Sequence, residues 1–565
     1  MSLSRPLVVV VAIAVMALAA FVLWRMPAEV KAPVGPAVAS GVVQGHVYTG
    51  CADEPDDVNP LTAHTSSARR LVLAYTHEPL LEIDPRNGEL RPALASAFEV
   101  AADGRSCVFT LREGVQFADG APMTMADVLF GWELHRAKHL PVGFMLDAFQ
   151  RVEAVDVLDE RRFRVHFKDV HYAACQAVGC AWLVPQKAFF VQRVASALPA
   201  GEPVPAIDSR EFAAAVDRID LECGPGTGPY MLRNERDGVS TWQVRQSLLL
   251  VRNEHCWRRQ VYPGSWNFAG IRTLVRDEAA ATNALLLGEI DWFSSGRIDE
   301  LRASHAAVEA NYRKLVYDYD TLGVYRVLWN CQRKPFDDPR VRRALGMLFD
   351  RAAIVACCGG AAVPALAHTK PDRPEYPVDL PAPRFDPVAA RQLLREAGFD
   401  PATGPALRVV LVAAQGTMVL RRIGEMFADA CKTAGVELDL RPRDIPGYLA
   451  ARKSGEWDGL LVMQSFRSFG DPFDLLHSTG TENWGKWQSA EADRLVAAAR
   501  AELDPVARVS LWQQLHHIVH EQQPAALLVH PKVAMLLSVH VQDAVAGKTG
   551  LAVDRAYVPL RFQRQ

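Results

Sequence analysis

One stretch of this sequence is the most informative about the fold: FDDPRVRRAL, residues 336–345. Acidic residues at its start suit the positive end of a helix dipole. Arginines then alternate with apolar residues, which predicts a helix with one buried and one solvated face. We therefore interpret the stretch as the start of a structural helix, with no catalytic role for its acids.

Other short motifs lie on both sides of this helix. In chain order they are DGAPMTMADV (119–128), GTGPY (226–230), GEID (288–291), Asn330 and, after the helix start, FDR (349–351). Each alone is weak evidence, but their order resembles the peptide-binding family of extracytoplasmic solute receptors. The resemblance runs from about Gly45 to about Val558. Receptors of that family deliver oligopeptides, dipeptides, nickel complexes or sugars to ABC importers.

The resemblance implies an α/β protein with the two-lobed periplasmic-binding-protein fold, type II-like, and a cleft at the hinge. Lobe I is expected from residues 45–90, 206–314 and 522–565, with an extra subdomain, residues 91–205, inserted in it. Lobe II is expected over residues 315–521. A ligand that contacts both lobes would favour the closed state over the open one.

Composition agrees with a soluble globular protein of more than one domain. The chain has 565 residues, of which 49% are hydrophobic and 22% charged, and this length exceeds one ordinary core. The net charge of -3 argues against a nucleic-acid-binding protein, because such proteins usually carry a basic surface. The ten cysteines form no CxxC pair and no zinc-like spacing with histidine. We expect no cofactor.

The N-terminus is the exception, because residues 6–24 are uncharged and almost wholly apolar. At 1.5 Å per residue such a helix spans about 28 Å, close to the hydrocarbon core of a bilayer. We predict that residues 1–25 are a signal anchor or a signal peptide, followed by a linker at 26–44. Ala17-Leu18-Ala19 fits a cleavage site, whereas Phe21–Trp24 continues the apolar run and favours an uncleaved anchor. The first cysteine, Cys51, lies too far along for a lipoprotein.

Local patterns predict alternating short strands and helices. The GTGPY stretch lacks the Lys-Ser/Thr ending of a phosphate loop, so we interpret it as a tight turn before a strand. Thr124 is expected to cap a helix. Strands are predicted at 108–111 and 163–167, and helices at 388–394, 489–503 and 506–520.

The stretch MQSFRSFGDP, residues 463–472, corresponds to the ligand segment of peptide-binding relatives. In them it reads roughly Trp-x-Ala-Asp-Tyr-x-Asp-Pro, and its first Asp holds the α-ammonium group of the peptide. Depending on the alignment, Ser468 or Arg467 occupies that position here, so the acid is absent. Two interpretations stay open: Arg467 holds a carboxylate or phosphate through paired hydrogen bonds, or it points to solvent on a β-edge.

The resemblance implies further ligand-binding residues in segments that face the cleft of relatives. Aromatic side chains there would provide apolar contact with little specificity, which suits ligands with varied side chains. These candidates are Glu54, Tyr448, Lys453, Trp484 and Trp487.

Histidine and cysteine patterns give weaker hypotheses. His135 and His139 have the i,i+4 spacing that can bind one metal ion, but no third ligand is evident, so no metal site is predicted. An exported chain meets an oxidising compartment, which makes two disulfides candidates: Cys223–Cys256 and Cys175–Cys180.

We therefore expect the substrate-binding receptor of an ABC-type importer, a monomer that binds a peptide or peptide-like solute and delivers it to a membrane permease. It would act on the extracytoplasmic side, anchored in the cytoplasmic membrane, and catalyse no reaction. One alternative is a sensor subunit that reports ligand to a membrane partner. Another is an enzyme on the same scaffold, such as a periplasmic hydrolase.

Overall fold

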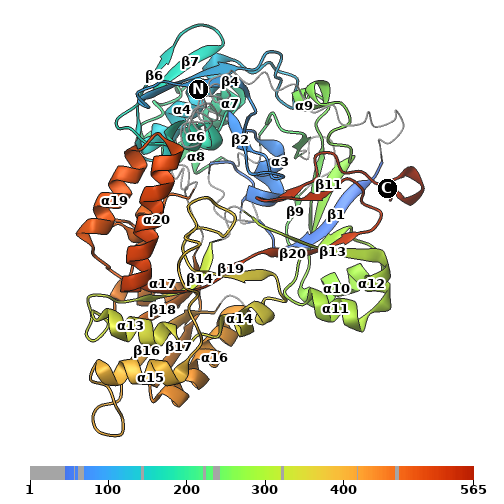
Figure 1. The fold of residues 1–565 in the computed structure, drawn as a ribbon. Helices are drawn as coiled ribbons and strands as arrows, with labels where there is room; N and C mark the ends of the chain where they lie inside the picture. The colour runs from blue at the N-terminus through green and yellow to red at the C-terminus, as the bar shows by residue number, and fades with distance from the viewer. Residues whose placement is uncertain are drawn as a thin grey trace, which may run out of the picture.

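The computed structural model describes residues 45–564 apart from 56, 62–68, 141–145, 220–223, 233–241, 320–322, 416–417 and 465–469. It is a mixed α/β protein in which two large sheets form separate lobes and a third, smaller sheet lies above them in the view of Figure 1. Within these residues no helix combines the length and apolar character needed to cross a bilayer. The predicted anchor and linker, residues 1–44, lie outside them.

Lobe I is organised by a mixed sheet with the order β13-β20-β12-β1-β11-β10-β8, to which β9 pairs at β10. Its central strand β1 is parallel to β11 on one side and to β12 on the other. The carboxyl ends of these three strands therefore meet at one edge of the sheet. The strands are β1 (Val47–Ala52), β8 (Tyr230–Met231), β9 (Trp242–Gln243), β10 (Ser247–Arg252), β11 (Gly270–Val275), β12 (Trp292–Phe293), β13 (Tyr312–Tyr317) and β20 (Val533–Ser538).

Lobe II has a second sheet in the order β15-β19-β14-β18-β16-β17. Apolar side chains of its strands form the largest core together with helices that include α13 and α16. Its elements are β14 (Val324–Trp329), α13 (Pro339–Gly346), α14 (Arg351–Cys357), β15 (Ala362–Pro364), α15 (Pro387–Glu396), β16 (Arg408–Ala414), α16 (Met418–Ala434), β17 (Glu437–Arg443), α17 (Ile445–Ser454), β18 (Gly459–Gln464), α19 (Ala490–Ala501), α20 (Pro505–Gln522) and β19 (Ala525–Pro531).

The chain crosses between the two sheets twice. It leaves lobe I after β13 and enters lobe II at β14, and it returns from β19 to β20 through Lys532. Asp318 lies at the first crossing, 3.2 Å from the Lys532 ammonium of the second. The chain thus passes from one sheet to the other between residues 317 and 324 and between residues 531 and 533. The predicted lobe boundaries at 315 and 522 remain a prediction.

The third sheet has the order β4-β5-β7-β6 and lies inside the predicted inserted subdomain. Alternate residues of β5 and β7 are buried, which confirms strands at 108–111 and 163–167. α4 packs against it and contributes Val128 and Trp132 to the same core. The elements are β4 (Ala95–Val100), β5 (Ser106–Leu111), α4 (Met125–Arg136), α5 (Leu146–Gln150), β6 (Val152–Val157), β7 (Arg162–Phe167), α6 (Ala174–Ala181), α7 (Lys187–Ser196) and α8 (Arg210–Val216).

The α19–α20 hairpin of lobe II reaches up to this third sheet (Figure 1). Asp471 of lobe II accepts a hydrogen bond from His171 at 3.1 Å and forms an ion pair with Arg500 at 2.8 Å. We call His171, Asp471 and Arg500 the interdomain triad. The Tyr172 N–H also donates to the Arg500 carbonyl at 2.9 Å, so backbone and side chains both connect the two parts.

Most local predictions are confirmed. Thr124 is the N-cap of α4, where its N–H and hydroxyl both donate to Asp127. Asp338 caps α13 through the Arg340 N–H, as an acid at a helix start should. The Gly226–Gly228 turn packs closely on Tyr75 and Thr76 before β8, and a Cβ at Gly226 would lie 1.9 Å from the Thr76 carbonyl oxygen. The turn is therefore structural.

Candidate functional site

A cavity of about 1580 Å³ lies between the two lobes. Its walls come from the lobe I sheet, from the crossing strands and from lobe II, with Tyr48, Tyr317 and Tyr325 as one example of each. Clefts that hold drug-sized ligands measure roughly 300–1,000 Å³. The cavity is therefore large enough for an extended solute that touches both lobes.

Polar residues of lobe I reach the cavity from the shared edge of the parallel strands. Asp53 directly follows β1, Arg276 follows β11 and Ser294 follows β12, and all three line the cavity. Ligands commonly bind at the carboxyl ends of parallel strands because the side chains of several strands converge there. The sheet topology thus brings together residues that are far apart in the sequence.

Aromatic rings cover much of the remaining wall. Tyr48 and Trp292 are neighbours at 6.4 Å, while Tyr75 and Trp266 meet edge to face at 6.2 Å. Such rings offer large apolar contact and few fixed hydrogen bonds, so they fit ligands whose side chains vary. The aromatic residues of the lining are Tyr48, Tyr75, Trp266, Trp292, Phe293, Tyr317, Tyr319 and Tyr325.

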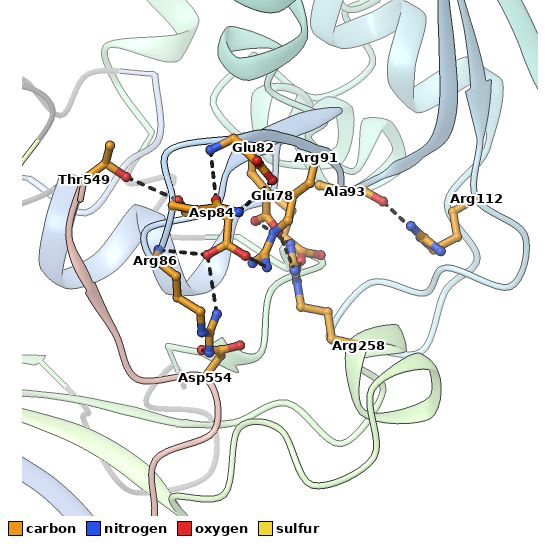
Figure 2. A network of polar contacts seen from close by, with 12 residues as sticks. Glu78, Glu82, Asp84, Arg86, Arg91, Ala93, Arg112, Arg258, Thr549 and Asp554 are labelled. Carbon is orange, nitrogen blue, oxygen red and sulfur yellow. Dashed lines mark hydrogen bonds and ion pairs between the residues drawn. The ribbon is translucent and has the colours of Figure 1, made fainter. Parts of the chain in front are cut away.

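A group of paired charges forms one side of the cavity, and we call Glu78, Glu82, Arg91 and Arg258 the cavity-wall network (Figure 2). Arg258 donates to both oxygens of Glu82 at 2.8 Å and also bonds Glu78. Arg91 donates to Glu82 at 2.7 Å. The Trp257 indole N–H donates to Glu78 at 2.7 Å, so each buried oxygen has a donor.

Further ion pairs extend this network to the C-terminal segment. Arg91 bonds Asp84 at 2.8 Å, and Arg86 bonds Asp554 at 2.5 Å (Figure 2). Thr549 and Asp554 both line the cavity. These contacts connect the strand pair β2 (Leu81–Ile83) and β3 (Leu90–Pro92) to the end of the chain beside the cavity.

In the cavity-wall network, burial and ion pairing shift the pKa values of the side chains in opposite directions. Burial raises the pKa of Glu78 above its ordinary value, although the Arg258 charge opposes the rise. Burial would also raise the pKa of Glu82, but Arg258 and Arg91 outweigh it and the pKa is lowered. Burial alone would lower the pKa of Arg258, yet its two carboxylate partners hold that pKa well above the usual value. The network is therefore an ionic part of the wall whose charges are already paired.

Among the described residues that line the cavity, fewer come from lobe II than from lobe I. It consists of the start of β14, the end of α14 and the first turn of α16. Arg422 is its cation, and this exposed side chain lies 3.3 Å from Glu425 on its own helix. An exposed pair of this kind is weak, so the Arg422 guanidinium can exchange partners with a ligand.

None of the predicted ligand residues that are described lines this cavity. Glu54 accepts a hydrogen bond from the Arg245 N–H at 2.6 Å. Tyr448 is 4% exposed in the lobe II core, and Lys453 is exposed on the same helix α17. Arg467 and Ser468 lie outside the described residues and stay predictions.

The two predicted tryptophans have structural partners. Trp487 is buried with α19 and α20, and its indole N–H donates to Gln522 at 2.9 Å. The Arg452 guanidinium lies over the ring of half-buried Trp484, 4.2 Å from its centroid. The sequence hypothesis missed Asp53, Arg276 and Trp292. The signal that could have found them is their place in or directly after strands that lie parallel in one sheet.

The histidine and cysteine hypotheses have mixed outcomes. His135 is a core residue whose Nδ1 bonds the Gly131 carbonyl at 2.6 Å, and burial lowers its pKa to about 4. In the described parts of the chain no three His, Cys, Asp or Glu side chains are grouped to hold a metal.

The predicted Cys175–Cys180 disulfide is wrong. Both residues lie on α6, and five residues of helix rise about 7.5 Å, beyond the reach of a disulfide. The Cys175 thiol instead neighbours Cys107 of β5, whose pKa is raised by burial and by that thiol. The predicted Cys223–Cys256 disulfide is also wrong, because Cys256 is a buried free thiol; Cys223 itself lies outside the described residues.

The family model of bacterial extracellular solute-binding proteins, family 5 Middle, matches residues 89–487. This chain belongs to that family. The match confirms the resemblance inferred from the order of the motifs, and it agrees with the expected extracytoplasmic location.

Individual relatives match almost the whole chain. Di/tripeptide-binding protein 3 of Pseudomonas aeruginosa is 25% identical over 553 residues, which cover 90% of this chain and 96% of the relative. The probable deoxycholate-binding periplasmic protein YgiS of Escherichia coli is 25% identical and covers 86% and 88%. The structure of AppA from Bacillus subtilis with a nonapeptide aligns with a TM-score of 0.71 at 20% identity, over 91% of this chain and 99% of AppA. The two-lobed fold of the family is thereby confirmed.

Proposed function

We propose that this chain is the substrate-binding receptor of an ABC-type importer and binds a peptide or peptide-like solute in the interlobe cavity. The observation that carries the proposal is the cavity of about 1580 Å³ with walls from both lobes and both crossing strands. A solute that touches all of these walls stabilises the closed arrangement, which a permease can then distinguish from the open one.

The lining supports a solute that carries both charge and apolar groups. Aromatic rings alternate with charged side chains such as Asp53, Arg276 and Arg422. Peptides have this mixture. Relatives of equal identity are named for di/tripeptides and for deoxycholate, so the bile salt belongs in any test as the competing ligand class.

A thermal-shift screen of the full chain tests the proposal. The set contains dileucine, trileucine, tetraalanine, their N-acetyl forms, maltose, citrate, a nickel–histidine chelate and deoxycholate. A ligand that binds only the native state at 100 times its Kd should add about 2.7 kcal/mol of stability. We expect stabilisation by peptides. Stabilisation by deoxycholate, maltose, citrate or the chelate alone would contradict peptide binding.

In this proposal residues 1–25 anchor the receptor in the cytoplasmic membrane, and the linker at 26–44 keeps it near its permease. Tethering raises the effective concentration of the receptor at the permease. The receptor acts as a monomer and catalyses no reaction. Fractionation of cells tests the anchor: the full chain should sediment with membranes, and a chain lacking residues 1–25 but supplied with a cleavable signal peptide should not.

A further inference from the structure

The third sheet packs against segments of lobe I. Its core includes Leu80 and Leu81 beside β2, together with Trp257 of α9 (Trp257–Val261), the helix that follows β10 of the lobe I sheet. A Cβ at Gly179 of α6 would lie 2.6 Å from the Leu81 side chain, so the contact is close. Because a well-packed apolar interface resists relative motion, we expect the third sheet to move with lobe I.

The same sheet also meets lobe II, at the interdomain triad. Asp471 follows β18 in lobe II, and both oxygens of its carboxylate have donors. One oxygen accepts from the Phe473 N–H at 2.9 Å, and the other meets His171 at 3.1 Å and Arg500 at 2.8 Å. Burial would raise the pKa of Asp471, but its two side-chain partners lower it, so the carboxylate is charged.

Two further contacts surround the triad. The Tyr172 N–H donates to the Arg500 carbonyl at 2.9 Å, and the Arg508 guanidinium lies 4.4 Å from the centroid of the Tyr172 ring. Gly104 of the third sheet faces Leu503 so closely that a Cβ there would lie 3.0 Å from its side chain. Arg500, Leu503 and Arg508 all belong to the α19–α20 hairpin that reaches the third sheet in Figure 1.

This interface is separate from the crossings of the chain and from the cavity. The chain crosses between the two large sheets at 317–324 and 531–533, and no member of the triad lines the cavity. Movement of lobe II away from lobe I about the crossings must therefore separate Asp471 and Arg500 from His171. Separation returns the carboxylate to water, which offsets much of the lost pairing and keeps the contact reversible.

We propose that the interdomain triad is a latch that holds the third sheet, and lobe I with it, against lobe II. The latch favours the closed arrangement of the cavity from a position outside it. Its effect on solute binding rests on the proposed function. A solute that needs the closed arrangement binds more weakly in proportion to the fraction of closed protein, whatever the chemistry of the solute.

The test compares Asp471→Asn and Arg500→Gln with the matched control Asp156→Asn in the full chain. Asp156 also pairs with a histidine, His166 at 2.8 Å, but both residues lie within the third sheet. Hydrogen exchange at the Tyr172 amide measures opening of the latch without any solute, because the acceptor of this amide is in lobe II. Exchange along β14 and β18 reports on the lobe II core. Titration calorimetry gives the Kd values of trileucine and tetraalanine.

We expect the Tyr172 amide to exchange about 10- to 100-fold faster in both triad variants than in wild type, as loss of a charge-assisted hydrogen bond implies. Exchange along β14 and β18 should stay unchanged, because opening of the latch is a local event. The Kd values of trileucine and tetraalanine should rise by one common factor. Asp156→Asn should match wild type in every measurement.

Three outcomes would overturn the inference. One is wild-type exchange at Tyr172 in both triad variants. Another is equal acceleration along β14 and β18, which would mean that lobe II unfolds. The third is faster exchange at Tyr172 that leaves the Kd of a bound peptide unchanged or changes the two Kd values by different factors. If wild type binds no peptide in the thermal screen or the titration, the proposed function fails, and the exchange rates still decide whether the latch exists.

Discussion

Two buried groups of charges in this protein differ in what they connect. The cavity-wall network lines the interlobe cavity, where Arg258 and Glu78 are each 5% exposed and fully paired. The interdomain triad joins the third sheet to lobe II, with the side chains of His171 and Asp471 7% and 5% exposed. The first group forms part of the cavity wall, and the second connects the third sheet to lobe II.

Buried ion pairs therefore have two different roles in this protein. The cavity-wall network balances two carboxylates with two guanidiniums. The triad contains an imidazole, which is the side chain that titrates between pH 5 and 8. We therefore expect the network to stabilise the cavity wall and the triad to determine how the third sheet and lobe II stay together.

Removing the central cation of the cavity-wall network should have the largest effect. Arg258→Met leaves Glu78 buried without its counter-charge, which should cost about 3–5 kcal/mol of unfolding free energy. Urea unfolding of wild type and variant measures the loss. The double variant Glu78→Gln/Arg258→Met should recover part of it, because no uncompensated charge remains. A loss below about 1 kcal/mol would contradict the role of the network.

Acidification should destabilise the folded protein through its buried histidines, which include His171 of the interdomain triad. Burial lowers the pKa of His171, even though the Asp471 hydrogen bond opposes the shift, and the charges of Arg151 and Arg500 add to it. Half-buried His77 and the buried His516 and His530 have pKa values that burial lowers to about 4. The unfolded chain then binds more protons than the folded one below pH 6.5.

Stability should consequently fall as the pH drops from 6.5 towards 4, by up to about 1.4 kcal/mol per pH unit for each such histidine. Urea unfolding at several pH values measures the slope. His171→Gln should reduce the slope, while Lys168→Gln, an exposed neighbour in sequence, should not. A slope that is unchanged by His171→Gln would show that the triad does not sense pH.

Asp471→Asn should have an intermediate effect. Burial would raise the pKa of Asp471, but the His171 hydrogen bond and the Arg500 charge outweigh it and hold the pKa below its ordinary value. Loss of that charge should cost about 1–3 kcal/mol, less than Arg258→Met, because the Arg500 side chain is 19% exposed and water can solvate it. Limited proteolysis between the third sheet and lobe II checks whether the loss is local.

Arg86→Ala should have the smallest effect. This pair with Asp554 has side chains 28% and 19% exposed, so water screens it. We expect about 1 kcal/mol or less. The Tm of the variant measures the change. A loss as large as that of Arg258→Met would mean that the C-terminal segment is as important to the wall as the buried pair.

Much of the fold could be predicted from the sequence because its signals are local. The helix start at Asp338, the turn at Gly226 and the cap at Thr124 depend on residues within a few positions of one another. Their order along the chain was sufficient to recognise the family. The two long helices before β19 follow from caps at Ser489 and Asp504.

The candidate site could not be predicted in the same way. Glu54 and Asp53 are adjacent acids, and only the packing of β1 between β11 and β12 decides that Asp53 reaches the cavity while Glu54 meets Arg245. Trp487, a predicted ligand residue, is buried in a hydrophobic core because it packs against α19 and α20.

The sequence by itself determined the family, the local elements and the absence of the expected acid at residues 467–468. The tertiary structure decided which residues line the cavity and which charges of its wall are already paired. The physical reason is distance along the chain: Glu78 and Arg258 are 180 residues apart, and His171 and Asp471 are 300 apart. Pairing across such separations is decided by sheet topology, which no local pattern encodes.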